Sequence, residues 1–244
     1  MAVMPLTAVA QDSIEASVEA GFVSRYMWRG QDLSGFSIQP AGELRWQGVT
    51  LRAAGSTGLH SDDLHEIDLS ASYNYMGFNV GVTDYWETGI DPQNRFFYFD
   101  TKTTGHRFEL NLGYTCEYFT AQAYTMMWGN DWKKNGKRAF STYFEVGVPL
   151  PVRFGGLDWL VTAGITPFES AGYYTQKMIE TSYGEAQANV PSYYYAEGFA
   201  CISATLRATK TLFVGDVQLP MFVEFHSNPY LQTARVLVGV TIKP

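Results

Sequence analysis

Five side chains of types that bind cations crowd one short stretch of the chain: His60, Asp62, Asp63, His65 and Glu66. Carboxylate and imidazole groups in an oxygen-rich loop can hold calcium. Their spacing matches no standard set of ligands, so we expect a solvated acidic loop here rather than a metal site. No cofactor is expected elsewhere, since the cysteines, Cys116 and Cys201, are solitary and match no metal or redox spacing.

A histidine and a serine stand side by side at His226 and Ser227. Some outer-membrane barrels hydrolyse lipids with residues of these types. Neighbours in a β-strand point to opposite faces, so these two side chains cannot share a hydrogen bond unless a bulge intervenes. The sequence therefore predicts that the protein is not an enzyme and has no catalytic residues, with a lipid hydrolase as the less favoured alternative.

The largest candidate set is a series of charged side chains at alternate positions of predicted strands. Eight acids and seven bases nearly cancel. Mixed charge of this kind forms ion pairs between neighbouring strands, and the same residues can line a weakly selective path for solutes. We expect Arg25 and Arg29 to pair with carboxylates nearby, such as Glu43. The full set, predicted to face the interior of a barrel, is Glu15, Glu19, Arg25, Arg29, Glu43, Arg45, Arg52, Glu66, Asp68, Arg107, Glu109, Glu145, Arg207, Glu224 and Arg235.

A tyrosine-rich segment, 167–194, is the predicted loop most able to fold inward and constrict a pore. Its rings can also stack on a flat or sugar-like ligand. A lid packed on its own side chains is the alternative. The residues of this possible constriction are Tyr173, Tyr174, Lys177, Glu180 and Tyr183.

Strands must position these side chains, because hydrophobicity alternates with a period of two from Ile14 onward. Twelve segments show the pattern, and most have about ten residues, the length of a tilted strand that crosses hydrocarbon. We expect local bulges at Pro40 and Pro220, because proline removes a donor from the ladder. The predicted strands are 15–28, 36–47, 49–57, 65–75, 78–87, 104–115, 118–128, 139–148, 157–166, 195–209, 217–227 and 233–243.

The connections between these segments alternate in length. Residues 47–48, 76–77 and 116–117 form tight turns, whereas long loops such as 58–64 and 167–194 join the other strand ends. Short turns on one rim, long loops on the other and an even strand number are typical of a transmembrane antiparallel up-and-down β-barrel. We therefore expect 58–64 and 167–194 outside the cell, and 47–48 and 76–77 in the periplasm.

A soluble β-sandwich would show the same alternation, but with its polar face in water. Two features favour the barrel: most lysines fall in the long loops, and aromatic residues cluster near both ends of the apolar strand faces. Two rings of aromatic side chains are the girdles of a membrane barrel. The expected girdle residues include Trp46, Tyr75 and Phe78 near the short turns, and Trp28, Phe36, Phe140 and Phe225 near the long loops.

Composition excludes two other classes. Only 17% of the 244 residues are charged and the formal net charge is −7, so nucleic acid is not an expected partner. The mean hydropathy of −0.13 is too low for a bundle of membrane-spanning helices.

The apolar start, Met1 to Ala10, ends in Ala-Val-Ala, a pattern that signal peptidase reads. We expect residues 1–10 to be the remnant of a signal peptide and 11–244 to form the barrel domain.

Residues 23–30, Val-Ser-Arg-Tyr-Met-Trp-Arg-Gly, followed by Gln39-Pro40, resemble the opening of the TorF family of porins, also described as Gcw_chp proteins. Matching positions are Ser24, Tyr26, Arg29, Gly30, Gln39 and Pro40. The resemblance implies a twelve-stranded outer-membrane barrel with channel activity.

Together these observations predict a porin-like barrel in the outer membrane of a Gram-negative bacterium, forming a narrow channel for ions or small solutes. Its partners would be outer-membrane lipid and those solutes. A structural or ligand-binding barrel without transport is the alternative.

Overall fold

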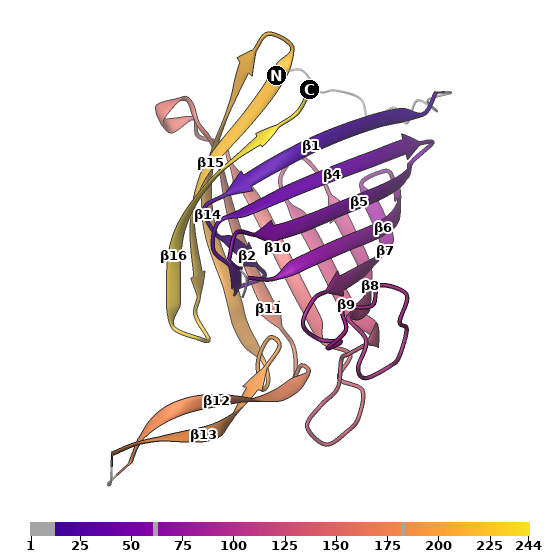
Figure 1. Ribbon diagram of the computed structural model, residues 1–244. Helices are drawn as coiled ribbons and strands as arrows, with labels where there is room; N and C mark the ends of the chain where they lie inside the picture. Colours follow the sequence, from indigo (N-terminus) through magenta and orange to yellow (C-terminus); the bar gives the residue numbers. More distant parts are fainter. Residues whose placement is uncertain (1–12, 61–62, 182–183) are drawn as a thin grey trace.

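The computed structural model describes residues 13–60, 63–181 and 184–244. Twelve strands of this part close an antiparallel barrel, which confirms the predicted all-β class and strand number. Each barrel strand pairs with the barrel strands that precede and follow it in the chain, and β1 closes the ring against β16 (Figure 1). No helix of the described residues is long and apolar enough to cross a membrane. The predicted signal remnant, 1–10, lies outside the described residues.

The strands fall into the barrel and two hairpins that lie outside its sheet. The hairpins are β2 (Tyr26–Trp28) with β3 (Gln31–Ser34), and β12 (Gly172–Thr181) with β13 (Gly184–Tyr193). One 3₁₀ turn, η1, covers Phe154–Gly156. The barrel strands are β1 (Glu15–Val23), β4 (Ser37–Trp46), β5 (Val49–Gly58), β6 (His65–Tyr75), β7 (Phe78–Glu87), β8 (His106–Thr115), β9 (Thr120–Gly129), β10 (Thr142–Leu150), β11 (Asp158–Thr166), β14 (Ala200–Val214), β15 (Val217–Asn228) and β16 (Thr233–Ile242).

Two-residue turns join β4 to β5, β6 to β7 and β14 to β15, and longer connections, 116–119 and 151–157, join β8 to β9 and β10 to β11. All lie at the end of the barrel where β1 begins and β16 ends (Figure 1). Gln47 and Gly48 have φ of 47° and 84°, and Met76 and Gly77 have φ of 49° and 85°. Positive φ at both central residues is the type I′ geometry, whose twist matches that of the paired strands. These dipeptides therefore fix the register of β4 with β5 and of β6 with β7.

The two faces of the strands differ in exposure as the alternation predicts. On β16, Val236 is 67% exposed and points outward, while its neighbour Leu237 is 4% exposed and points inward. On β8, Leu112 is 53% exposed and Glu109 is 1% exposed. The barrel is thus apolar outside and polar inside.

The first predicted strand is too long. It ends at Val23, and Tyr26 and Trp28 leave the sheet in the β2–β3 hairpin, so the assignment of Trp28 to an aromatic girdle is wrong. The physical cause is a chain reversal at Arg29 and Gly30, whose φ values are 47° and 81°. Period-two alternation continues through the hairpin and does not mark where the chain leaves the sheet.

The predicted bulges at the prolines are also wrong. Pro40 pairs with Ala20, and Pro220 pairs with Thr211, in continuous registers. The missing donor of Pro40 faces β5, where the pairing passes from Ile38 directly to Ala41. Register shifts occur instead between Phe108 and Glu109 on β8 and between Gly164 and Ile165 on β11.

Candidate functional site in the barrel lumen

A short hairpin lies inside the barrel, toward the end opposite the termini, and we call residues 24–35 the plug hairpin (Figure 1). The chain enters it from β1 and leaves it into β4. Its tip reaches across the lumen, where Arg29 contacts Glu109 of β8 and Gly30 contacts Asn228 of β15. One segment thereby joins strands from opposite sides of the barrel.

Arg29 at the tip of the plug hairpin is the best-satisfied charge in the lumen. Its two terminal nitrogens donate to the two carboxylate oxygens of Glu109 at 2.5 and 2.8 Å, and Nη1 also donates to the Tyr195 hydroxyl at 2.8 Å. The guanidinium carbon lies 3.8 Å from the ring centre of Tyr124 and 4.4 Å from that of Trp28. A planar guanidinium suits both the bidentate contact and the stacking, which lysine cannot reproduce.

Gly30 allows the tip to approach the barrel wall. A Cβ atom at this position would lie 1.8 Å from the carbonyl oxygen of Ile202, and its φ of 81° is unfavourable for any side chain. Asn228 Nδ2 donates to the Gly30 carbonyl at 3.0 Å. Only glycine fits this contact without moving the backbone.

The base of the plug hairpin is tied to itself and to β16. Arg25 donates to Asp32 at 2.7 Å, and Arg235 of β16 donates to the same carboxylate at 3.2 Å. Beside them, the Ser24 hydroxyl accepts from the Val238 amide at 3.0 Å, and the Ser24 amide donates to the Val238 carbonyl at 2.9 Å. The hairpin is therefore held at both its tip and its base.

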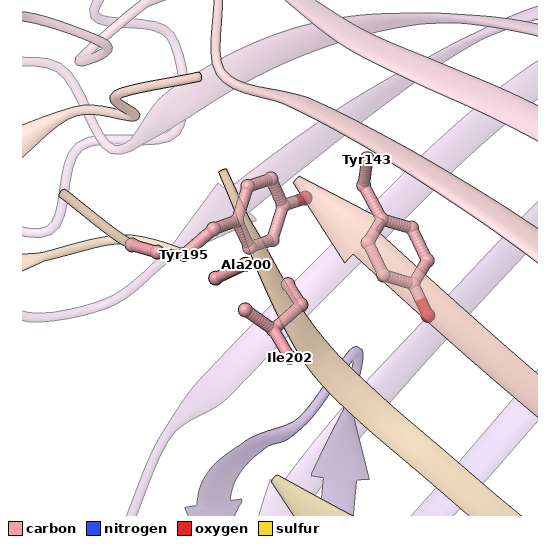
Figure 2. Packing of buried hydrophobic residues seen from close by; sticks show 5 residues of the cluster. Tyr143, Tyr195, Ala200 and Ile202 are labelled. Atoms are coloured by element: carbon pink, nitrogen blue, oxygen red, sulfur yellow. The ribbon is translucent and has the colours of Figure 1, made fainter. Parts of the chain in front are cut away.

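A second segment, between β13 and β14, also packs into this end of the lumen. Tyr195 and Ala196 are buried, and their amides donate to the Ser170 hydroxyl at 2.8 and 3.1 Å. The rings of Tyr195 and Tyr143 have centres 5.7 Å apart, and Figure 2 shows Tyr195 beside Ile202. This apolar cluster covers the Arg29 pair on one side.

The lumen is closed at the end opposite the termini and more open at the other. Around the circumference near the plug hairpin, inward-facing residues of nearly every strand are 9% exposed or less. Nearer the termini, inward residues such as Ser17, Arg45 and Asn74 are exposed. The plug hairpin and the inward residues around it thus fill one end of the lumen. The buried inward residues are Val23, Ser37, Ser56, Glu66, Arg107, Glu109, Met126, Tyr143, Thr166, Ser203, His226, Asn228 and Leu237.

Near the open end, the predicted charges meet across neighbouring strands. Arg52 donates to Glu19 at 2.7 Å and lies 3.7 Å from Glu43, which also accepts from Arg45 at 2.5 Å. Lys243 adds a further contact to Glu19 at 2.9 Å. In the register of β1 and β4, Glu15 stands opposite Arg45.

The other predicted charges lie deeper in the lumen and find more varied partners. Arg207 donates to Glu224 at 2.6 Å, Glu145 accepts from the Tyr143 hydroxyl at 2.7 Å, and one oxygen of Asp68 is buried with no hydrogen-bond partner in the described chain. Two further contacts join Arg107 to Glu87 and the Tyr26 hydroxyl to Glu66.

The predicted pairing of Arg25 and Arg29 with Glu43 is wrong. Arg25 binds Asp32 and Arg29 binds Glu109, whereas Glu43 binds Arg45 and Arg52. The reason is the chain reversal described above, which carries both arginines out of β1 and away from β4.

Three lumenal side chains form a serine, histidine and glutamate series that the sequence pattern did not indicate. His226 Nε2 lies 3.3 Å from the Ser203 hydroxyl, and His226 Nδ1 lies 3.1 Å from a carboxylate oxygen of Glu224. Ser227, on the other face, donates to the Ala204 carbonyl. Ser203 is 2% exposed, so a substrate carbonyl cannot reach its hydroxyl in this conformation.

The five residues considered as cation ligands do not converge where they are described. Glu66 faces the lumen, where it contacts Tyr26, while His65 lies 2.7 Å from the Thr57 hydroxyl. His60 lies 3.5 Å from Asp63, and the amide of His60 holds the pKa of the Asp63 carboxyl below its ordinary value. Asp62 lies outside the described residues. No metal-binding cluster occurs among the described residues.

The predicted inward fold of 167–194 is wrong for the part that is described. The segment forms the β12–β13 hairpin, which extends away from the barrel (Figure 1). Ten successive residue pairs join its two strands, from Gly172 and Tyr193 at the base to Thr181 and Gly184. Tyr173 and Tyr174 lie near that base; the side chains of Lys177 and Glu180, and Tyr183 as a whole, lie outside the described residues.

A further loop, 88–105, borders the closed end, and Asp91 organises it. This carboxylate accepts from the Arg95 amide at 2.9 Å and from Arg95 Nε at 3.0 Å. The hydrogen bond from the Arg95 side chain, together with those from the amides of Arg95 and Gln93, lowers the pKa of Asp91 to about 2 against the opposing effect of desolvation. The carboxylate therefore stays ionised at neutral and mildly acidic pH and continues to accept hydrogen bonds from Arg95.

Several lumenal partners are not predicted by the strand alternation, among them Asp32, Glu87, Tyr195, Ser203 and His226. Asp32 and Tyr195 belong to segments that enter the lumen from outside the barrel sheet, where strand alternation gives no information. A detectable signal was the Arg29-Gly30 dipeptide, because a glycine inside a predicted strand marks a bend or a close backbone approach.

No family model matches the chain, and no curated protein matches it. Among solved structures, one described as "Unveiling the Mechanism Behind the in-meso Crystallization of Membrane Proteins" is similar at a TM-score of 0.46 and 9% identity. The similarity covers 94% of this chain and 83% of the other. The barrel assignment itself rests on the strand pairing described above.

The Arg29 contact generates a stability prediction. Arg29→Ala leaves Glu109 charged and buried without a cation, so we expect the free energy of unfolding to fall by about 3–5 kcal/mol. Arg25→Ala is the matched control, because its ion pair is half-exposed and such pairs contribute about 1 kcal/mol or less. Heat-modifiable gel migration gives the unfolding temperature of each variant. Equal unfolding temperatures of Arg29→Ala and wild type would contradict a buried ion pair between Arg29 and Glu109.

Proposed function

We propose that the protein is a porin-like barrel of a Gram-negative outer membrane, with lipid around it and a narrow, gated path for ions or small solutes through it. Its outer surface supports this proposal, because apolar side chains such as Leu112, Val223 and Val236 are at least half exposed on successive parts of the barrel. Large exposed apolar surfaces are unfavourable in water and match the hydrocarbon of a bilayer.

Membership of the TorF family is part of this proposal. The residues that carry the resemblance have identifiable roles in the plug hairpin or next to it. Ser24 bonds to Val238, Tyr26 to Glu66, Arg29 to Glu109 and Gly30 to Asn228. We propose that this lumenal hairpin is the common feature of the family's opening segment.

The observation that carries the gating proposal is the buried tip of the plug hairpin. The Arg29 and Glu109 side chains are 8% and 1% exposed, and the inward residues around them are buried as well. A water-filled bore would leave such residues accessible. Conduction therefore requires the tip to leave Glu109, and the plug hairpin is the gate.

The charges along the path predict weak selectivity between anions and cations. The eight acids and seven bases of the predicted set nearly cancel. Adding Asp32, Glu87 and Lys243, which contact members of that set, preserves the near balance. Twelve strands also leave less free cross-section than the sixteen to eighteen of large porins.

Single-channel recording in planar bilayers tests the gate. We expect small and infrequent steps from the wild type, and larger, longer openings from Arg29→Ala, because the tip loses its bidentate anchor. Arg25→Ala should show the same step size and open time as wild type, because it leaves the contact between Arg29 and Glu109 intact. The reversal potential in a salt gradient should lie near zero for all three.

Silence of the wild type and of Arg29→Ala would reject transport and favour the structural or ligand-binding alternative. A large, steady wild-type current would reject the plug hairpin as a gate. A strongly anion-selective current would reject the near balance of lumenal charge.

We also propose that the barrel is not an enzyme, because Ser203 is closed off from substrate. A fluorophosphonate probe labels activated serines. We expect no labelling of the folded wild type above that of Ser203→Ala. Labelling that disappears in Ser203→Ala and in His226→Ala would overturn this and establish a hydrolase.

The proposed membrane topology places the long loops outside the cell. In a Cys116→Ser, Cys201→Ser background, Glu185→Cys on β13 should react with an impermeant maleimide on intact cells. Asp216→Cys, in the exposed turn between β14 and β15, should react only after lysis. The opposite result would reverse the orientation.

A further inference from the structure

A cavity of about 310 Å³ lies on the plug hairpin at the closed end of the barrel. The hairpin contributes Trp28, Gln31 and Leu33 to its lining, and the barrel wall contributes Tyr85 and Arg107. Small-molecule sites range from about 300 to 1,000 Å³, so this cavity suits a single ring rather than a chain of rings. The Arg29 and Glu109 pair is not among its lining residues. The cavity borders that pair through Trp28, which lies against the Arg29 guanidinium, and through Tyr85, whose hydroxyl donates to Glu109 at 3.0 Å.

Aromatic rings form much of the cavity wall. Trp28 lies 5.6 Å from Tyr194 and 5.7 Å from Tyr85, measured between ring centres, and the ring planes meet at 52° and 70°. Tyr173, from the base of the β12–β13 hairpin, is 50% exposed and also belongs to the lining. Inclined rings of this kind offer apolar faces to the C–H surface of a ligand ring while their polar edges remain available.

Two hydrogen-bond donors of the lining are without partners. Gln31 Nε2 and Arg107 Nε are buried and make no hydrogen bond in the described chain. A buried donor without a partner is unfavourable, and a small rotation of either side chain toward the cavity would let a ligand oxygen satisfy it. The cavity therefore favours a ligand that carries hydrogen-bond acceptors.

The lining also holds two carboxylates, Glu66 and Glu87, against the single guanidinium of Arg107. Glu66 accepts from the Tyr26 hydroxyl and Glu87 from Arg107, and each carboxylate retains further lone pairs. An excess of carboxylates disfavours an anionic ligand. An ammonium ligand has no acceptor for Gln31 or Arg107, so the groups present suit a neutral molecule that both donates and accepts hydrogen bonds.

We infer that this cavity is a binding site for a neutral monosaccharide in its ring form. A pyranose combines an apolar C–H face for Trp28 and the tyrosines with hydroxyl groups that accept from Gln31 and Arg107 and donate to the carboxylates. Because Trp28, Gln31 and Leu33 belong to the plug hairpin, the sugar binds on the gate itself. Sugar binding in this cavity does not depend on the proposed function. Transport of the bound sugar through the barrel rests on it.

Binding can be measured without any current. We propose saturation-transfer NMR and calorimetry on the full chain in lauryldimethylamine oxide micelles, which contain no sugar, with D-glucose, D-galactose and D-mannose as probes. Sodium lactate and choline serve as anionic and cationic comparators. At least one hexose should bind saturably and both comparators should not.

The two neighbouring tyrosines of β12 provide matched variants. Tyr173→Ala removes a ring from the cavity and should weaken hexose binding at least tenfold, as should Gln31→Leu. Tyr174→Ala removes an equally large, exposed ring that lies over Lys134 instead and should leave binding unchanged. Heat-modifiable migration at the wild-type temperature shows that each variant is folded.

Failure to bind any hexose, equal loss in Tyr173→Ala and Tyr174→Ala, or preferential binding of lactate or choline would overturn the site. Hexose binding by a protein that passes no current would keep the site and reject the channel. Current without hexose binding would keep the channel and reject the site.

Discussion

The closed end of this barrel depends on one ion pair, between Arg29 and Glu109. Transferring either charge from water into the lumen alone would be prohibitive, and the bidentate geometry, the Tyr195 hydroxyl and the rings of Tyr124 and Trp28 together compensate for that loss. The pair fixes the tip of the plug hairpin, and the tip in turn determines which lumenal residues are covered. Buried polar contacts of this kind specify one arrangement of the chain more than they add stability.

The two faces of this barrel differ in polarity, and most side chains follow the division, although Asp84 and His106 pair on the outward face of β7 and β8. Outside, aliphatic residues such as Leu112 and Val236 replace the surface charges of a soluble sheet. Inside, nearly every described charge meets an opposite charge, a hydroxyl or a ring. The plug hairpin extends this polar interior inward, so the lumen resembles the core of a soluble protein built from ion pairs and tyrosines.

How far the sequence predicts the structure depends on which residues lie in the barrel sheet. Residues on barrel strands, such as Glu109 and Leu112, were assigned to the correct face because one residue of register error would invert the entire pattern. Arg29 was placed correctly in the lumen but on the wrong element and with the wrong partner. Its true partner is 80 positions away, and only the three-dimensional path of the hairpin brings them together. Strand alternation cannot predict such a contact. For the same reason it cannot predict the cavity that Trp28 and Tyr194 line.

The seam between the first and last barrel strands has a consequence for how the chain folds. β1 pairs with β16 only from Ala20 to Val23, although it pairs with β4 along its entire length. The two partners of this seam stand near opposite ends of the 244-residue chain, so their meeting is the most costly loop closure of the fold. This cost favours pairing of sequential strands before the seam closes, and the seam itself is held by only four residue pairs. Since the plug hairpin begins directly after Val23, the last residue of β1 in the seam, closure of the cylinder also brings the start of this hairpin against β16, where Ser24 bonds to Val238.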